Sequence, residues 1–255
     1  MTAPLAIVTG GSTGIGRHLV QHLATAGYAV GFSHVGDAAS ATALVDELVG
    51  KGGIVRAFAR DAGNKAEVGA FLAEAAEWHG KVPRLLVNNA GIQTWGPLLD
   101  LSEEDWDSVI RTNLKGCFLH TQVAGRMMAD AGGGGTIVNI GSGCNKLAFP
   151  NLVSYTASKG GIEQFTKSAA IELGRFGITV NCVAPGAIAT DRTLQETPDY
   201  ETSWAPLTPL GRVGTPADIA GVVQFFDTPA ARFVTGQTIW VDGGLFTRAA
   251  WAYPQ

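Results

Sequence analysis

The stretch Leu5-Ala6-Ile7-Val8-Thr9-Gly10-Gly11-Ser12-Thr13-Gly14-Ile15-Gly16 joins an apolar run to a glycine-rich turn. An unbroken apolar run of this length is typical of a strand that is buried on both faces of a parallel sheet. The residues from Gly14 to Ala26 are predicted to be helical, so the glycines lie where a strand passes into a helix. At such a junction, backbone N–H groups and the positive end of the helix dipole can bind a pyrophosphate.

The three glycines Gly10, Gly14 and Gly16 have the spacing G-x-x-x-G-x-G. This differs from the commoner G-x-G-x-x-G dinucleotide fingerprint, and the Lys-Ser/Thr pair of an ATP-binding P-loop does not follow. A turn that only needs positive φ angles is the alternative for the motif alone. Its place after a buried strand favours a dinucleotide phosphate site.

Apolar runs and amphipathic stretches alternate along the rest of the chain, which predicts an α/β fold with a doubly wound parallel sheet in three α/β/α layers. The expected later strands are 28–33, 54–59, 84–88, 136–140, 178–183 and 237–241, and the expected later helices are 38–49, 65–78, 103–131 (with a possible break), 155–175 and 216–226. The run Gly132 to Gly135 is expected to be a flexible break. The chain lacks a Pro/Ser-rich linker and a short repeat, so the prediction is one domain over residues 1–255, with a lid near 190–210.

Composition excludes several classes of function. The chain has 255 residues, 46% of them hydrophobic, a formal net charge of -4 and no cluster of Lys or Arg, so neither nucleic acid nor a membrane surface is an expected partner. No apolar stretch would span a bilayer, and Met1 to Pro4 do not resemble a secretory leader. The three widely spaced cysteines predict reduced thiols in a cytoplasmic protein and no metal site.

The segment Tyr155-Thr156-Ala157-Ser158-Lys159 is the most informative stretch for chemistry. A tyrosine and a lysine four residues apart share one face of a helix. A free phenol ionises near pH ~10, but a neighbouring ammonium favours the phenolate, so such a pair can exchange protons with an alcohol or a carbonyl near neutral pH. A surface Tyr/Lys pair is the alternative interpretation.

Two further polar residues are candidates for the same site. Ser142 follows the strand expected at 136–140, and the carboxyl ends of parallel strands border the ligand crevice, so its hydroxyl could hold a substrate oxygen against Tyr155. The alternative is an ordinary turn serine. Asn113 lies in an expected helix, where asparagine is a mediocre helix former. It could orient a water or the Lys159 ammonium, or it could mark a kink or an exposed position.

Taken as a set, these motifs resemble the short-chain dehydrogenase/reductase family over nearly the whole chain. The matching positions are Thr9 to Gly16, Asn88-Asn89-Ala90-Gly91, Asn113, Ser142, Tyr155 with Lys159, Pro185-Gly186 and Val241-Asp242-Gly243-Gly244. The resemblance implies a Rossmann-like domain and an NAD(P)-dependent oxidoreductase that acts on an alcohol or carbonyl substrate. It also implies a homotetramer.

The resemblance implies four catalytic roles. Tyr155 would be the general acid/base, Lys159 would assist it and bind the nicotinamide ribose, Ser142 would orient the reacting oxygen, and Asn113 would support a proton relay through water. The implied cofactor contacts are Gly10, Ser12, Thr13, Gly14, Ile15 and Gly16 at the phosphates, Asp61, Ala62, Asn89, Ala90 and Gly91 on the adenine side, and Pro185, Gly186, Ile188 and Thr190 around the carboxamide, with Tyr155 and Lys159.

The choice between the two dinucleotides is predicted from the end of the second strand. NAD-preferring members place an aspartate there, which accepts the ribose 2′-OH and repels a 2′-phosphate. This chain has Ser33-His34 instead, and His34 could donate to a phosphate. Thr13 stands where NADP-preferring members often have arginine, and Arg60 precedes Asp61 in place of a small residue. NADP is therefore the predicted cofactor, with NAD as the alternative.

The resemblance leaves the substrate open between a sugar or polyol and a 3-oxoacyl thioester, since both sugar 1-dehydrogenases and 3-oxoacyl-carrier-protein reductases are similar. The segments Gln93-Thr94-Trp95 and Glu196 to Pro209 are expected to shape the pocket, and Trp95 offers an apolar or sugar-stacking face. One alternative function is a non-catalytic protein that senses a nicotinamide dinucleotide on the same fold. A transferase that binds ATP or S-adenosylmethionine is a weaker alternative, because the P-loop lysine is missing.

Overall fold

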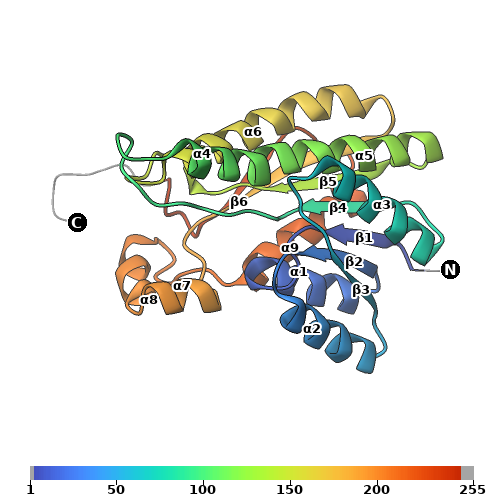
Figure 1. The fold of residues 1–255 in the computed structure, drawn as a ribbon, viewed down its shortest axis with the longest axis horizontal. Helices are drawn as coiled ribbons and strands as arrows, with labels where there is room; N and C mark the ends of the chain where they lie inside the picture. Colours follow the sequence, from blue (N-terminus) through green and yellow to red (C-terminus); the bar gives the residue numbers. More distant parts are fainter. Residues whose placement is uncertain (1–2, 248–255) are drawn as a thin grey trace.

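A seven-stranded parallel sheet forms the centre of the protein (Figure 1), and the computed structural model describes residues 3–247. The strands are β1 (Leu5–Val8), β2 (Ala29–His34), β3 (Ile54–Ala59), β4 (Leu85–Asn88), β5 (Gly135–Ile140), β6 (Ile178–Pro185) and β7 (Thr238–Val241). They lie in the order β3-β2-β1-β4-β5-β6-β7, with every pairing parallel. The order reverses between β1 and β4, and ligands of doubly wound sheets bind at such a switch point.

Helices cover both faces of this sheet, as Figure 1 shows. One face packs against α1 (Gly14–Thr25), α2 (Ala38–Gly50) and α9 (Pro216–Phe226), the other against α3 (Lys65–His79), α5 (Gly116–Ala131) and α6 (Val153–Gly174). Successive side chains of β1 point to opposite faces of the sheet. Ala6 and Val8 belong to the core under α1, α2 and α9, and Leu5 and Ile7 belong to the core under α3, α5 and α6. The predicted Rossmann-like fold with three α/β/α layers is confirmed.

The helix expected over 103–131 is broken, as the sequence allowed. Its parts are α4 (Glu103–Val109), a π-helical turn η1 (Ile110–Lys115) and α5. Asn113 lies in the π-helical turn and is buried, so the exposed interpretation is wrong. Such turns often occur at functional sites.

Most predicted boundaries differ from the observed ones by one or two residues, and two of these differences concern the site or the glycine run. Gly132 (φ 69°) and Gly134 (φ 67°) make the expected break, but Gly135 is buried as the first residue of β5. Helix α6 begins at Val153 rather than Tyr155, so Tyr155 lies within its first turn.

The segment 190–210 forms short helices: α7 (Asp191–Glu196), α8 (Tyr200–Trp204) and the 3-10 turn η3 (Ala205–Leu207). Two further 3-10 turns are η2 (Gly143–Asn145) and η4 (Pro229–Ala231). Thr190 caps α7, because its hydroxyl accepts a hydrogen bond from the Thr193 N–H at 3.2 Å. Between residues 3 and 247, none of the helices combines the length and the apolar character that crossing a membrane requires.

Candidate active site

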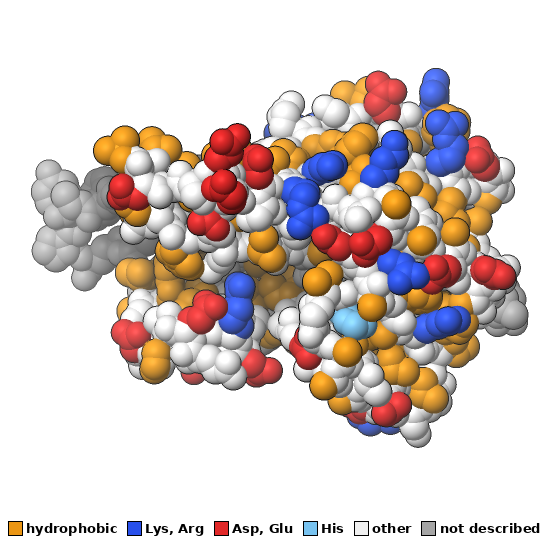
Figure 2. All heavy atoms as spheres, viewed as in Figure 1, with side chains coloured by type: hydrophobic (Ala, Val, Ile, Leu, Met, Phe, Trp, Pro, Cys, Tyr) orange, Lys and Arg blue, Asp and Glu red, His pale blue; other side chains and the backbone are white. Residues whose placement is uncertain are grey.

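A cavity of about 1270 Å³ opens at the edge of the sheet where β1, β4, β5 and β6 end. Figure 2 shows the recess between the surface over α4 and the surface over α7 and α8. Every residue that the sequence predicted to contact the cofactor lines this cavity, and so do the catalytic candidates Ser142, Tyr155 and Lys159. Asn113 is the predicted site residue that does not line it. The structure therefore brings segments from the whole length of the chain to one place.

The glycine loop is fixed by the end of β4. Asn89 Nδ2 donates to the carbonyl oxygens of Thr9 (3.0 Å) and Gly10 (2.9 Å), and the Thr9 hydroxyl accepts from the Asn89 and Ala90 N–H groups, each at 2.9 Å. Gly10 has φ 64° and a Cβ there would lie 3.0 Å from Ala90 Cα, so only glycine fits. The sequence predicted Asn89 beside the adenine; the hydrogen bonds of its side chain go to the loop.

At the end of β2, His34 is buried and its Nδ1 has no hydrogen-bond partner among the described residues. A buried polar nitrogen without a partner is costly, so a water or a bound ligand has to satisfy it. Arg17, on the first turn of α1, lines the same part of the cavity.

Asp61 is held by its neighbours at the far end of the cavity. Its Oδ2 lies 2.6 Å from Arg111 Nη1, and its Oδ1 accepts from the Gly63 N–H at 2.8 Å. Partial burial opposes ionisation, but the hydrogen bonds from Arg111 and Gly63 outweigh it and lower the pKa of Asp61. The carboxylate is therefore a charged acceptor that Arg111 already partly satisfies.

Lys159 is buried on α6 with its Nζ 5.4 Å from the centroid of the Tyr155 ring. The same Nζ donates to the Ile140 carbonyl oxygen at 2.8 Å, which holds the ammonium against the end of β5. Ser142 comes two residues after β5, and its hydroxyl accepts from the Cys144 N–H at 3.2 Å. That contact leaves the Ser142 proton available to a ligand oxygen.

Asn113 acts beneath the cavity. Its Oδ1 accepts from the Ile92 N–H (2.8 Å), and its Nδ2 donates to the Ile92 carbonyl (2.9 Å) and to Ser158 Oγ (3.0 Å). Ser158 Oγ in turn donates to the Tyr155 carbonyl oxygen at 2.7 Å. Asn113 thus joins the segment after β4 to the helix of Tyr155, and its side-chain hydrogen bonds go to Ile92 and Ser158. Ser158 is a positioning residue that the sequence reasoning missed, although it lies between Tyr155 and Lys159.

A buried polar network below the cavity was also missed. Asn88 Nδ2 donates to Asn139 Oδ1 (2.8 Å) and Thr121 Oγ1 (3.0 Å), and Asn139 Nδ2 donates to Thr166 Oγ1 (2.9 Å). Cys117 Sγ lies 3.2 Å from Asn139 Oδ1, and burial raises the pKa of this thiol to about 12. The network ties β4 and β5 to the helices beneath them. Asparagines inside otherwise apolar strands were the available signal in the sequence.

The segment after β6 closes the cavity. The Gly186 N–H donates to the Val241 carbonyl at 3.0 Å, and a Cβ on Gly186 would lie 2.6 Å from Asp242 Cα, so a side chain has no room. Ile188 pairs with Gly214 in an isolated parallel bridge. Tyr200 of α8 faces this segment: it lines the cavity, a backbone hydrogen bond joins it to Ile188, and burial raises the pKa of its phenol.

The fold and this cavity define a class: an oxidoreductase with a dinucleotide-type phosphate loop and a tyrosine–lysine pair at the carboxyl ends of a doubly wound sheet. Comparison with known proteins agrees. A family model described as Enoyl-(Acyl carrier protein) reductase matches residues 10–246. The 3-oxoacyl-(acyl-carrier-protein) reductase of Staphylococcus aureus is 39% identical over 241 residues, covering 94% of this chain and 97% of that protein. The (3R)-3-hydroxyacyl-CoA dehydrogenase of Mus musculus is 38% identical over 253 residues, covering 96% and 97%.

Two solved structures share the whole architecture. A gluconate 5-dehydrogenase from Burkholderia cenocepacia, in complex with NADP and tartrate, superposes with a TM-score of 0.89 at 34% identity and covers 98% of this chain and 97% of that one. The acetoin dehydrogenase YohF of Salmonella typhimurium gives 0.86 at 32% identity, covering 96% and 98%. The chain belongs to the short-chain dehydrogenase/reductase family, and the predicted class of enzyme, an oxidoreductase that acts on hydroxyl and carbonyl groups, is confirmed.

Proposed function

We propose that the protein moves a hydride between NADP(H) and a hydroxyl or carbonyl carbon, with Tyr155 as the acid/base. The observation behind this proposal is that the glycine loop, Ser142, Tyr155 and Lys159 line a single cavity. The alternative of a non-catalytic sensor predicts damage to the proton-transfer groups, and all four predicted catalytic residues are present.

The chain's own residues would manage the proton and the orientation. A nicotinamide dinucleotide, when bound, supplies or accepts the hydride. In the reduction direction the carbonyl carbon gains the hydride, and the carbonyl oxygen gains the phenolic proton of Tyr155. Lys159, held by the Ile140 carbonyl, stabilises the phenolate that forms, and Ser142 donates to the same substrate oxygen. Asn113 and Ser158 keep the Tyr155 backbone in register with the segment at Ile92.

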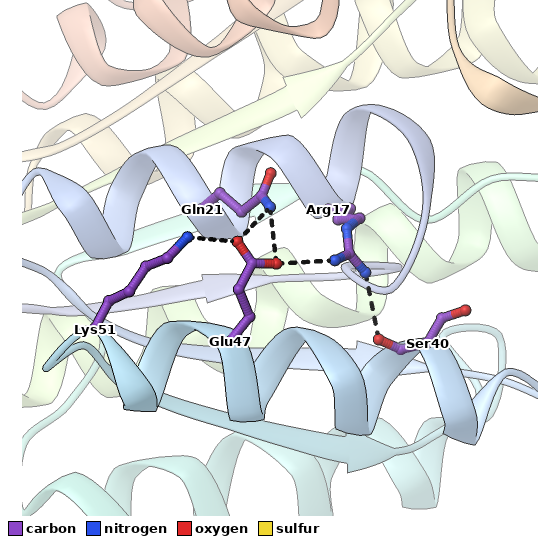
Figure 3. Close-up of polar contacts among 5 residues, drawn as sticks. All are labelled: Arg17, Gln21, Ser40, Glu47 and Lys51. Atoms are coloured by element: carbon purple, nitrogen blue, oxygen red, sulfur yellow. Dashed lines mark hydrogen bonds and ion pairs between the residues drawn. The ribbon is translucent and has the colours of Figure 1, made fainter.

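Residues at the end of β2 support NADP in preference to NAD. The strand ends in Ser33-His34, without the aspartate of NAD-preferring members, and His34 Nδ1, if it carries the proton, could donate to a phosphate oxygen. Arg17 adds a guanidinium, which Figure 3 shows beside Glu47, with Nη2 3.1 Å from Glu47 Oε2 and Nη1 3.5 Å from the Ser40 carbonyl. The neighbour from Burkholderia cenocepacia, solved with NADP, is consistent with this choice.

Three accompanying features form part of the proposal: a single domain, a lid formed by residues 190–210, and a homotetramer in the cytoplasm. The edge strand β7 supports an assembly, because each of its residues is half-buried and Phe233 nearby is fully exposed in the isolated chain. The three described cysteines are free thiols, as expected in a reducing compartment. Light scattering on the purified protein would test the tetramer, and a monomer would exclude it.

The decisive experiment is a substrate panel of aldoses, polyols, small ketones and 3-oxoacyl thioesters, read by nicotinamide absorbance with NADP(H) and NAD(H). We expect turnover with NADP(H) at a higher kcat/KM and loss of turnover in Tyr155→Phe with the Kd for the dinucleotide nearly unchanged. Equal inactivity of wild type and variant on every compound, with intact dinucleotide binding, would favour the sensor. A preference for NAD would overturn the choice of cofactor.

A further inference from the structure

Two exposed acidic segments border the mouth of the cavity. The first, residues 100–107, contains Asp100, Glu103, Glu104, Asp105 and Asp107 and no basic residue, and it follows the segment of Gln93 and Trp95, which lines the cavity. The second, residues 191–201, contains Asp191, Glu196, Asp199 and Glu201 against one basic residue, Arg192. We refer to these two segments as the acidic lips. Figure 2 shows acidic side chains over α4 on one side of the recess and over α7 and α8 on the other.

The acidic lips concentrate the negative charge of the protein at one place. They hold nine carboxylates and one guanidinium, a net charge of -8, whereas the whole chain has -4, so the remaining residues carry +4. A charge of one sign on both sides of a cleft raises or lowers the local concentration of a charged ligand severalfold or more. The lips therefore place a negative potential beside the substrate end of the cavity, although the rest of the molecule has a net positive charge.

Inside the mouth, the substrate end of the cavity is aromatic. Its lining includes Trp95, Phe149, Tyr200, Trp204 and Phe246, beside the polar but uncharged Gln93, Ser142 and Thr197. These side chains suit a ligand with apolar or C–H-rich faces and a few hydroxyl or carbonyl oxygens.

The basic residues that line the cavity are engaged elsewhere. Arg17, Arg60 and Arg111 lie toward the dinucleotide end and pair with Glu47, Glu74 and Asp61. At the substrate end, Lys159 is held by the Ile140 carbonyl, and Arg192 is exposed with its Nε 3.8 Å from Glu196 Oε1. Within the described lining, Arg192 is the one exposed basic residue at the substrate end, and Glu196 beside it offsets its charge.

We propose that the substrate is a small uncharged hydroxy or keto compound, and that the acidic lips discriminate against acyl groups carried on a phosphate-bearing pantetheine arm. The proposal rests on the oxidoreductase function proposed above and narrows its substrate class. Coenzyme A and carrier-protein thioesters bring phosphates to the mouth of the cavity, whereas sugars, polyols and hydroxyketones bring none. The relatives include proteins named for acyl-carrier-protein or acyl-CoA substrates and one named for acetoin. The negative charge of the lips favours the uncharged kind of substrate for this chain.

A matched pair of substrates separates the reacting group from the carrier. The same 3-oxoacyl group is presented as the neutral N-acetylcysteamine thioester and as the coenzyme A thioester, alongside acetoin-type ketones and ketoses, with NADPH as reductant. At low ionic strength we expect the neutral thioester to have a kcat/KM at least about tenfold higher than the coenzyme A thioester. The ratio should fall as KCl is raised from about 20 mM to about 500 mM, because salt screens the lips.

Reversing the charge of one lip tests the proposal, and reversing a charge elsewhere on the surface is the control. The double variant Glu103→Lys, Glu104→Lys should raise kcat/KM for the coenzyme A thioester severalfold and leave the neutral thioester within about twofold. Glu172→Lys, on the exposed surface of α6, changes the charge of the chain away from the lips and should alter neither.

The outcomes are distinct. Equal or faster turnover of the coenzyme A thioester in the wild type would overturn the substrate assignment while the oxidoreductase function stands. Loss of that turnover in Arg192→Gln would then assign phosphate recognition to Arg192. NADPH oxidation with none of the compounds, although NADPH binds, would overturn the proposed function itself.

Discussion

The two ends of the cavity are built in different ways. At the dinucleotide end, the hydrogen bonds join distant parts of the chain: Asn89 to Gly10 across 79 residues, and Asn113 to Ser158 across 45. At the substrate end, the bonds of Thr190, Asp199 and Thr208 reach only three or four residues along the chain. The first end is therefore fixed by the fold as a whole, and the second consists of short helices that can change without disturbing the sheet. Substitutions in these short helices can therefore alter the substrate while the proton-transfer groups stay in place.

The strongest test of the fixed end is the ammonium of Lys159. Lys159→Met should lower kcat by about 100-fold or more, because the group that stabilises the Tyr155 phenolate is removed. Lys167→Met, on the same helix, removes an exposed ammonium paired with Glu163 and should leave kcat within about twofold. Steady-state kinetics on both variants would measure the contrast, and equal loss in the two would mean that α6 as a whole had been damaged.

The buried scaffold beneath the fixed end should be sensitive to acid. Burial lowers the pKa of His120 to about 4, although a backbone hydrogen bond with Gly116 opposes the shift. Below pH 6.5, the ordinary pKa of histidine, His120 binds a proton in the unfolded chain, whereas in the folded chain it stays neutral down to about pH 4. Stability from this group is therefore complete above pH 6.5 and falls by roughly 3 kcal/mol as the pH is lowered toward 4.

Urea unfolding between pH 7 and pH 4 would measure this loss. His120→Gln should flatten the pH dependence, whereas His79→Gln, whose ring is only partly buried, should retain it. An unchanged slope in His120→Gln would assign the acid sensitivity to other groups.

The hydrogen bonds from Asn89 to the glycine loop should have a more moderate effect, on dinucleotide affinity. Asn89→Ala removes two donors to the loop, so we expect the Kd for the dinucleotide to rise about tenfold, an effect of about 1–2 kcal/mol. Asn181 is a matched control, because its Nδ2 donates to the Val234 carbonyl at 2.8 Å and its Oδ1 accepts from Gln237 N at 3.1 Å, in contacts outside the cavity. Asn181→Ala should reduce stability and leave dinucleotide affinity unchanged; titration by tryptophan fluorescence would compare them.

The smallest expected effect concerns the lid. Thr193→Val removes the hydroxyl that accepts from the Thr190 N–H at 2.8 Å, yet it should change the free energy of unfolding by less than about 1 kcal/mol, since the bond is local and partly exposed. KM for the substrate should shift severalfold with dinucleotide affinity unchanged. A large loss of stability would show that the lid is as tightly coupled to the fold as the glycine loop.

The difference between the two ends of the cavity also determined how much of each could be predicted from the sequence. Motifs at the dinucleotide end, such as Gly10 to Gly16 and the Tyr155/Lys159 pair, are short and sit where strands end, so the order of strands and helices was enough to bring them together. The Asn113–Ser158 contact was not predictable, because it depends on how a π-helical turn packs against α6. The lid was expected only as an aperiodic segment, since helices of five or six residues leave little periodicity. Fold and chemistry were thus more predictable than the residues that select the substrate.

The asparagines at the ends of β4 and β5 have a consequence for how the sheet assembles. Asn88 and Asn139 occupy the same register position, where Asn88 Nδ2 donates to Asn139 Oδ1 at 2.8 Å. If β4 slipped by one residue against β5, the two amides would face opposite layers, and each would be left among aliphatic side chains. The pair therefore penalises misaligned strands during folding, and the edge that presents Ser142 and the glycine loop can assemble in only one alignment.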